Sequence, residues 1–209
     1  MIVLYNPPSN EAGKPVLPMA LLALGAVIEE RREYVIVDGN LEEDPLSALE
    51  ATIRRRDAEV LAVTVMGGPQ LHHAVPHCRA LKERYPDLTI VWGGYFPTQH
   101  YEICLRADYV DLVVRGHGEH TFARVLKALE RGGDLGEIPG LAYQEPGSGA
   151  LRTNERAPIP DPNALPGFPY HRVPMDRYVR STFMGDRTLP HHSSYGCPFT
   201  CNFCAVVNM

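Results

Sequence analysis

The sequence lacks a hydrophobic run that could cross a membrane. Its longest apolar stretch, residues 16–28, is interrupted by Pro18 and Gly25 and is too short to span a bilayer. The first residues read as a strand and carry neither the basic region nor the cleavage site of a secretory signal. We therefore expect a cytoplasmic protein without a membrane partner, in a compartment where thiols stay reduced.

The sequence also lacks an excess of positive charge. Its 20 lysine and arginine residues are outnumbered by 25 acidic residues, for a net charge of −5, and no basic patch stands out. Nucleic acid is therefore not an expected partner. There is no internal repeat or low-complexity tract. A chain of 209 residues with a hydrophobic fraction of 44% can bury a substantial core.

What the sequence does contain is a regular alternation of apolar runs and helical stretches. We predict strands at residues 2–5, 34–37, 60–66, 88–92 and 112–115, and helices at 17–32, 45–56, 70–85 and 119–131. This alternation predicts an α/β fold over residues 1–137, with an open, doubly wound, parallel five-stranded sheet of Rossmann-like class. A glycine-rich dinucleotide motif is missing, because Asn6-Pro7-Pro8 follows the first strand.

The texture of the sequence changes after residue 137. Residues 141–143 and 151–153 flank a turn that contains proline and glycine, and they predict a short hairpin. Six prolines between residues 157 and 174 indicate a semi-rigid linker rather than a core segment. We therefore assign residues 138–187 to a hairpin and linker. Residues 188–209 form the last segment, in which 188–195 read as a strand that leads into a cysteine-rich loop.

Three of the five cysteines lie in this loop, with an aromatic residue just before the third. They follow a C-x3-C-x2-C spacing and are, together with that aromatic residue, Cys197, Cys201, Cys204 and Phe203. Three thiolates can hold three irons of a 4Fe-4S cluster and leave the fourth iron open, whereas an electron-transfer ferredoxin uses four cysteines. A zinc site completed by His191 or His192 is one alternative, and disulfides are another. The remaining cysteines, Cys78 and Cys104, are expected as buried free thiols in predicted helices.

Four loops follow the carboxyl ends of predicted strands, where ligands bind in open α/β sheets. Three of them are rich in glycine, which either makes a tight turn or lets the backbone approach a ligand closely. Three such loops on one edge favour a broad ligand. The candidate residues are Asn6, Pro7, Pro8, Met66, Gly67, Gly68, Gly93, Gly94, Tyr95, Phe96, Pro97, Arg115, Gly116, His117, Gly118 and Glu119.

The cysteine loop resembles the signature of the radical S-adenosylmethionine (SAM) superfamily, C-x3-C-x-aromatic-C. Upstream of it, residues 91–98 and 111–121 resemble the cobalamin-binding domain that precedes radical SAM barrels. Residues 140–143 and 165–166 match the bridge between that domain and the barrel. The resemblance therefore covers essentially the whole chain.

This resemblance implies a cobalamin-dependent radical SAM enzyme that performs radical-based methyl transfer, cyclisation or a related C–H functionalisation. Its three cysteines would hold a 4Fe-4S cluster, and SAM would bind the open iron with Phe203 near its adenine. Cobalamin would lie against the glycine-rich edge of the sheet. The implied partners are a small-molecule substrate and an electron donor such as flavodoxin or ferredoxin.

The sequence departs from the family pattern at two positions: Phe96 stands where a histidine is common, and His117 where an acidic residue is common. The D-x-H-x-x-G motif, which supplies an axial histidine to cobalt in the classical cobalamin domain, is also missing. The resemblance therefore implies a cobalt without a histidine from that motif.

A complete barrel takes about 250 residues, and only its first strand and cluster loop are expected here. We therefore expect the amino-terminal part of such an enzyme, without complete activity by itself. The alternatives are a stand-alone cobalamin- or nucleotide-binding module, and a flavodoxin-like FMN protein with a zinc-binding tail.

Overall fold

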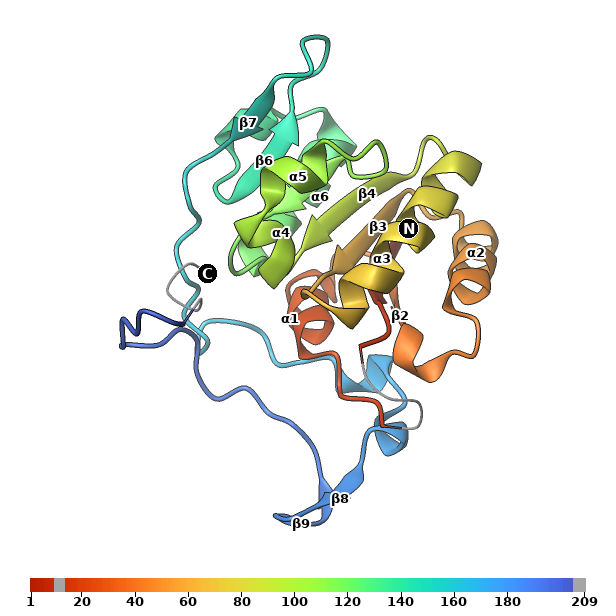
Figure 1. Cartoon of the computed structure of the whole chain (residues 1–209), viewed down its shortest axis with the longest axis vertical. Coiled ribbons are helices and arrows are strands. Elements are labelled where there is room, and N and C mark those ends of the chain that lie inside the picture. Colours follow the sequence, from red (N-terminus) through yellow and green to blue (C-terminus); the bar gives the residue numbers. More distant parts are fainter. Residues whose placement is uncertain (10–13, 205–209) are drawn as a thin grey trace.

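A computed structural model describes residues 1–9 and 14–204 and shows a mostly parallel sheet with helices on both faces (Figure 1). The strand order is β2-β1-β3-β4-β5-β6-β7. The strands β1 to β5 run parallel and comprise Ile2–Asn6, Tyr34–Asp38, Val60–Thr64, Thr89–Gly93 and Leu112–Val114. The predicted α/β class and the parallel sheet are confirmed.

The predicted hairpin is present, but it extends the main sheet. Strand β6 (Leu141–Gln144) pairs antiparallel with β5, and β7 (Leu151–Thr153) pairs antiparallel with β6. The five predicted parallel strands are present, and the hairpin adds two antiparallel strands, so that the sheet has seven strands in all. The pairing gives hydrogen-bond partners to the outer backbone of β5, which would otherwise be an open edge. It also fully buries Leu141 and Ala142, one on each face of the sheet.

Two hydrophobic cores form because successive side chains of a strand point to opposite faces. Val3 and Tyr5 of β1 join the core beneath α2 (Pro45–Arg56), α3 (Pro69–Arg84), α4 (Tyr95–Gln99) and α5 (Tyr101–Leu105). Ile2 and Leu4 join the core beneath α1 (Met19–Ile28) and α6 (Glu119–Arg131). The helices thus divide between the two faces, as a doubly wound sheet requires (Figure 1).

Local sequence explains where the helices begin and end. The bounds of α2 and α6 agree with prediction, because each has clear end signals. At the start of α2, Asp44 accepts a hydrogen bond from the backbone N–H of Ser47 at 3.1 Å. Gly132 closes α6 in the left-handed conformation, with φ of 65°. Helix α1 is shorter than predicted, because Pro18 stands just before its first residue and a turn follows Ile28.

Part of the proline-rich linker packs tightly onto the sheet domain, contrary to the prediction that it contributes no core. We call residues 168–178 the strap. Val173 and Tyr178 of the strap are buried against Leu17, Met19 and Leu22 in a third, small hydrophobic cluster. The strap is therefore fixed to α1 by apolar contacts.

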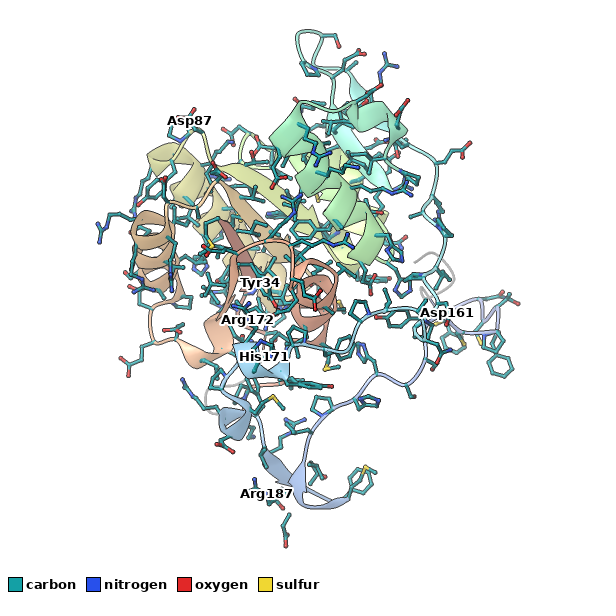
Figure 2. All side chains as sticks on the ribbon, turned by 180° about the vertical axis from the view of Figure 1, so that it is seen from behind. Tyr34, Asp87, Asp161, His171, Arg172 and Arg187 are labelled. Carbon is teal, nitrogen blue, oxygen red and sulfur yellow. The ribbon has the colours of Figure 1, made fainter. Side chains whose placement is uncertain are left out.

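Two polar clamps hold the same strap. Glu29, just after α1, accepts a hydrogen bond from Arg172 Nε at 2.8 Å and is bonded to His171 Nε2 at 2.9 Å. The Arg172 guanidinium lies over the Tyr34 ring, and Figure 2 shows Tyr34, His171 and Arg172 close together. At the second clamp, the Tyr178 hydroxyl donates to Asp38 Oδ2 at 2.7 Å.

The end of the linker and the last segment both differ from their predictions. Strands β8 (Arg180–Thr182) and β9 (Gly185–Thr188) form a separate two-stranded hairpin. Residues 189–195, predicted as strand, have no regular secondary structure. A strand needs a partner for its backbone groups, and no described residue supplies one to this stretch. Residues 205–209, the end of the predicted segment, lie outside the described residues. Among the residues that are described, no helix is both long and apolar enough to span a membrane.

Candidate functional site

A cavity of about 360 Å³ lies at the carboxyl ends of β3, β4 and β5, on the face covered by α1 and α6. Its walls are mostly apolar side chains and glycines. They come from the three strands, from one side of α1, and from the loop that opens α6. The main wall residues are Ala20, Ala23, Leu24, Ala62, Val63, Val91, Gly93, Gly94, Val114, Gly116, Gly118 and Phe122.

A side chain would be crowded at two glycine positions in this wall. Gly94 has φ of 95°, and a side chain there would lie 3.1 Å from the backbone of Val65. At Gly118 a Cβ atom would lie 3.2 Å from Val114 Cγ1 and 3.4 Å from Leu24 Cδ2. Glycine therefore lets α6 start close against β5 and α1, which shapes the cavity.

A cluster of polar side chains stands at one side of the cavity. The Tyr195 hydroxyl donates a hydrogen bond to Glu119 Oε1 at 2.8 Å. The Tyr195 ring stacks on His117 with 4.6 Å between ring centroids, and His192 meets its edge at 6.4 Å. Burial, followed by the hydrogen bond to Glu119, raises the pKa of Tyr195, so its hydroxyl stays protonated and remains a donor.

The Glu119 carboxylate is buried, with 4% of the residue exposed. Its second oxygen, Oε2, has no hydrogen-bond partner. Within residues 1–9 and 14–204, Arg115 Nε is the other buried side-chain nitrogen or oxygen without a hydrogen-bond partner. Buried polar groups are normally paired, so an unpaired carboxylate oxygen beside a cavity is an unused acceptor.

The structure brings six of the sequence-predicted residues together in this cavity. Two of them lie at the end of β4, and four lie between the end of β5 and the first residue of α6. They are Gly93, Gly94, Gly116, His117, Gly118 and Glu119. Arg115, next in this loop, points elsewhere: its guanidinium lies over the Tyr101 ring and bonds Thr153.

The other predicted loops lie outside the cavity wall. Asn6 is buried and donates to Asp38 Oδ1 at 2.8 Å, and it accepts from Gln70 Nε2 at 2.7 Å. Pro7 and Pro8 follow it in the same loop. The exposed loop after β3 contains Met66, Gly67 and Gly68, and the short helix α4 contains Tyr95, Phe96 and Pro97. Their roles in ligand binding remain predictions.

Sequence reasoning missed the α1 side of the cavity and most of the wall that residues 192–196 supply. Ala20 and Ala23 lie three residues apart, one helical turn, and leave space above the sheet. Their small size facing glycine-rich loops was the available signal. Ser194, Tyr195 and Gly196 also line the cavity, and nothing in the local pattern indicated this.

The three loop cysteines are accessible. Cys197 and Cys201 are exposed, Cys204 is half-buried, and Phe203 is 92% exposed. The part of the chain that the structure describes holds no group of three His, Cys, Asp or Glu side chains arranged for a metal ion. Cluster binding by these thiols therefore stays a prediction from their spacing.

The two remaining cysteines behave as predicted. Cys78 and Cys104 are buried free thiols. Burial raises the pKa of Cys78 to about 12 against the opposing effect of Trp92, whose indole N–H donates to its sulfur at 3.3 Å. Burial also raises the pKa of Cys104 to about 11. Both thiols are therefore held in the protonated form at neutral pH, which disfavours metal ligation and nucleophilic attack.

The structure is a doubly wound α/β domain with a cavity at the carboxyl edge of its sheet, the place where ligands bind in such folds. Residues 9–126, more than half of the chain, match the B12 binding domain family. The chain therefore belongs to the B12-binding domain family, and it carries a cobalamin-binding domain related to cobalamin-dependent radical SAM methyltransferases. The suspected family is confirmed.

Curated relatives extend the similarity to nearly the whole chain. An uncharacterized methyltransferase, PH0819 of Pyrococcus horikoshii, is 30% identical over 211 residues, which cover 98% of this chain and 45% of the relative. An anaerobic magnesium-protoporphyrin IX monomethyl ester cyclase of Synechocystis sp. is 30% identical over 215 residues, covering 97% and 42%. The chain thus spans less than half the length of either relative.

Solved structures support the same fold. The cobalamin-dependent SAM radical enzyme OxsB, with aqua-cobalamin and SAM bound, superposes with a TM-score of 0.66 at 19% identity, over 76% of this chain and 22% of that one. The radical SAM methyltransferase TsrM of Kitasatospora setae, with cobalamin and a 4Fe-4S cluster bound, gives 0.61 at 23% identity, over 80% and 31%.

Proposed function

We propose that the chain binds cobalamin at the cavity and serves a radical SAM enzyme that performs methyl transfer, cyclisation or a related C–H functionalisation. The cavity itself is the observation that carries the proposal. It lies where the predicted loops of β4 and β5 converge, and all of its wall except residues 192–196 belongs to the segment that matches the B12 binding domain family. The methyltransferase and cyclase names of the relatives support the reaction class.

The walls of the cavity suit one part of cobalamin better than the rest. Alanine, valine, leucine and glycine line a narrow space, and these residues favour a flat, apolar ring. The benzimidazole of the nucleotide tail is such a ring. The corrin carries amide groups around its rim, which need hydrogen bonds or water. We therefore assign the benzimidazole to the cavity and the corrin to the surface outside it.

The cluster and SAM belong to the same proposal but rest on the cysteine spacing. Cys197, Cys201 and Cys204 would supply three thiolates to a 4Fe-4S cluster, and SAM would complete the fourth iron. When bound, these cofactors supply the radical chemistry, while the protein binds and orients them. Phe203, exposed beside Cys204, is available to pack against the adenine of SAM. A small-molecule substrate and a flavodoxin or ferredoxin as electron donor complete the proposal.

Two other functions give different ligand preferences. A stand-alone cobalamin module would bind cobalamin without a cluster. A flavodoxin-like protein would bind FMN, and the parallel strands share the β2-β1-β3-β4-β5 order of that fold. The match to the B12 binding domain family favours a corrinoid over FMN.

Absorbance titration with three ligands separates these functions. Hydroxocobalamin is expected to bind, and cobinamide, which lacks the nucleotide tail, is expected to bind at least about tenfold more weakly because it leaves the cavity empty. FMN is expected not to bind. Equal affinity for cobalamin and cobinamide would remove the benzimidazole from the cavity, and preferential binding of FMN would overturn the corrinoid assignment.

A further inference from the structure

The cavity wall has two parts that are far apart in the sequence. One part belongs to the sheet and to α1 and α6. The other part is a stretch of the chain that ends one residue before Cys197 and includes His192, Ser194, Tyr195 and Gly196. We call residues 192–196 the cover. A ligand in the cavity therefore touches the segment that carries the predicted cluster ligands.

Few contacts hold the cover in place. Four of its five residues are exposed, and Tyr195 alone is half-buried. Gly196 lies close to Ile159 on the outgoing part of the linker, since a Cβ atom at Gly196 would be 3.7 Å from Ile159 Cδ1. Tyr195 makes the remaining anchor, through its stack on His117 and its hydrogen bond to Glu119.

Glu119 is a fixed point for this anchor. It is the first residue of α6, whose buried side chains pack against β5 and α1, and it is almost fully buried. One carboxylate oxygen accepts from Tyr195, and the other has no partner. A carboxylate can accept several hydrogen bonds, so a hydroxyl or amide donor of a bound ligand can share it with Tyr195.

We propose that Tyr195 is a positioning residue that closes the cover over the cavity, so that filling the cavity and placing the cysteine loop are coupled through Glu119. The coupling rests on the proposed binding of cobalamin in the cavity. A ligand that completes the Glu119 hydrogen bonds stabilises the closed cover. By reciprocity, a closed cover strengthens ligand binding by the same factor.

The test follows Tyr195 directly by ¹⁹F NMR of the 209-residue chain labelled with 3-fluorotyrosine. The Tyr195 signal is identified by its loss in Tyr195→Phe. We expect it to shift in Glu119→Gln, which replaces the charged acceptor, and to shift again when hydroxocobalamin binds. Tyr143 lies in β6 and does not line the cavity, so its signal is the matched control and is expected not to move.

Cobalamin affinity provides the second readout. Tyr195→Phe is expected to weaken hydroxocobalamin binding roughly tenfold, in line with loss of a hydrogen bond to a charged group. Tyr143→Phe is expected to bind as wild type does. The coupling would be overturned, with cobalamin binding left intact, if wild type and Tyr195→Phe bound hydroxocobalamin equally and the Tyr195 signal had the same chemical shift in Glu119→Gln as in wild type. Absence of cobalamin binding in wild type would overturn the proposed function and the coupling with it, even if Glu119→Gln still shifted the Tyr195 signal.

Discussion

At the scale of single residues, exposure divides the five cysteines into two groups. Cys78 and Cys104 lie in the hydrophobic core, where burial keeps their thiols protonated. Cys197 and Cys201 are exposed, and Cys204 is half-buried. Metal ligation requires a thiolate that the metal can reach. Only the second group meets that requirement.

This division leads to a prediction for iron loading. Anaerobic reconstitution with iron and sulfide should give a cluster absorbance that Cys201→Ala abolishes, because two thiolates remain. The matched control Cys78→Ala should load iron as wild type does. Iron and sulfide content per chain checks both variants. If a triple variant in which Cys197, Cys201 and Cys204 are all replaced by alanine loaded as much iron as wild type, the cluster assignment would be contradicted.

At the scale of elements, the strap is held to α1 by an ionised carboxylate. Burial opposes the charge on Glu29, but hydrogen bonds from Arg172, Tyr34 and His171 outweigh it, so the pKa of Glu29 falls below its usual 4.5. A lowered pKa means that the folded state prefers the charged form. The clamp therefore contributes stability above pH 4.5, and the contribution is lost as pH falls through the lower, folded-state pKa.

Glu29→Gln should show this dependence. At pH 7 the variant should have a lower free energy of unfolding than wild type, because the charged acceptor for Arg172 and His171 is gone. The difference should shrink as pH falls below 4.5. Glu30→Gln is the matched control, since Glu30 is exposed beside it and should change little. Urea unfolding at several pH values measures both, and a difference that is constant with pH would refute the clamp.

Sequence could predict the elements but not how distant ones meet. The apolar runs placed all five parallel strands, and the predicted bounds of α2 and α6 agree with the ends that Asp44 and Gly132 cap in the structure. Docking of Tyr178 on Asp38, and of Tyr195 on Glu119, joins residues 140 and 76 positions apart. Such contacts depend on the path of the chain in space, and the local hydrophobic periodicity of a sequence carries no information about that path. The same limit hid the pairing of β6 with β5.

At the scale of the whole molecule, the pairing of β6 with β5 has a consequence for the extent of the folding unit. Leu141 and Ala142 contribute to the two main cores. A chain cut at the predicted boundary, residue 137, loses both and exposes the edge of β5. A chain that ends at residue 155 keeps the complete seven-stranded sheet.

We therefore predict that residues 1–155 unfold cooperatively and are more stable than residues 1–137. The difference should be about 3 kcal/mol, of the order of one fully buried leucine with its neighbours. Urea unfolding of the two truncated chains, followed by circular dichroism, provides the measurement. Identical midpoints would show that the hairpin adds nothing to the sheet domain.

Binding of cobalamin in the cavity is tested most directly by closing the cavity without disturbing the fold. Ala20 is an exposed residue of α1 whose side chain lines the cavity, so Ala20→Phe would fill the space without overpacking a core. Ala48→Phe makes the same change on α2, which contributes no residue to the cavity wall.

The measurement is the hydroxocobalamin dissociation constant of wild type and both variants, with unfolding curves to show that all three are folded. We predict that Ala48→Phe binds as wild type does and that Ala20→Phe binds at least about tenfold more weakly. Equal affinity in all three proteins would contradict binding at this cavity.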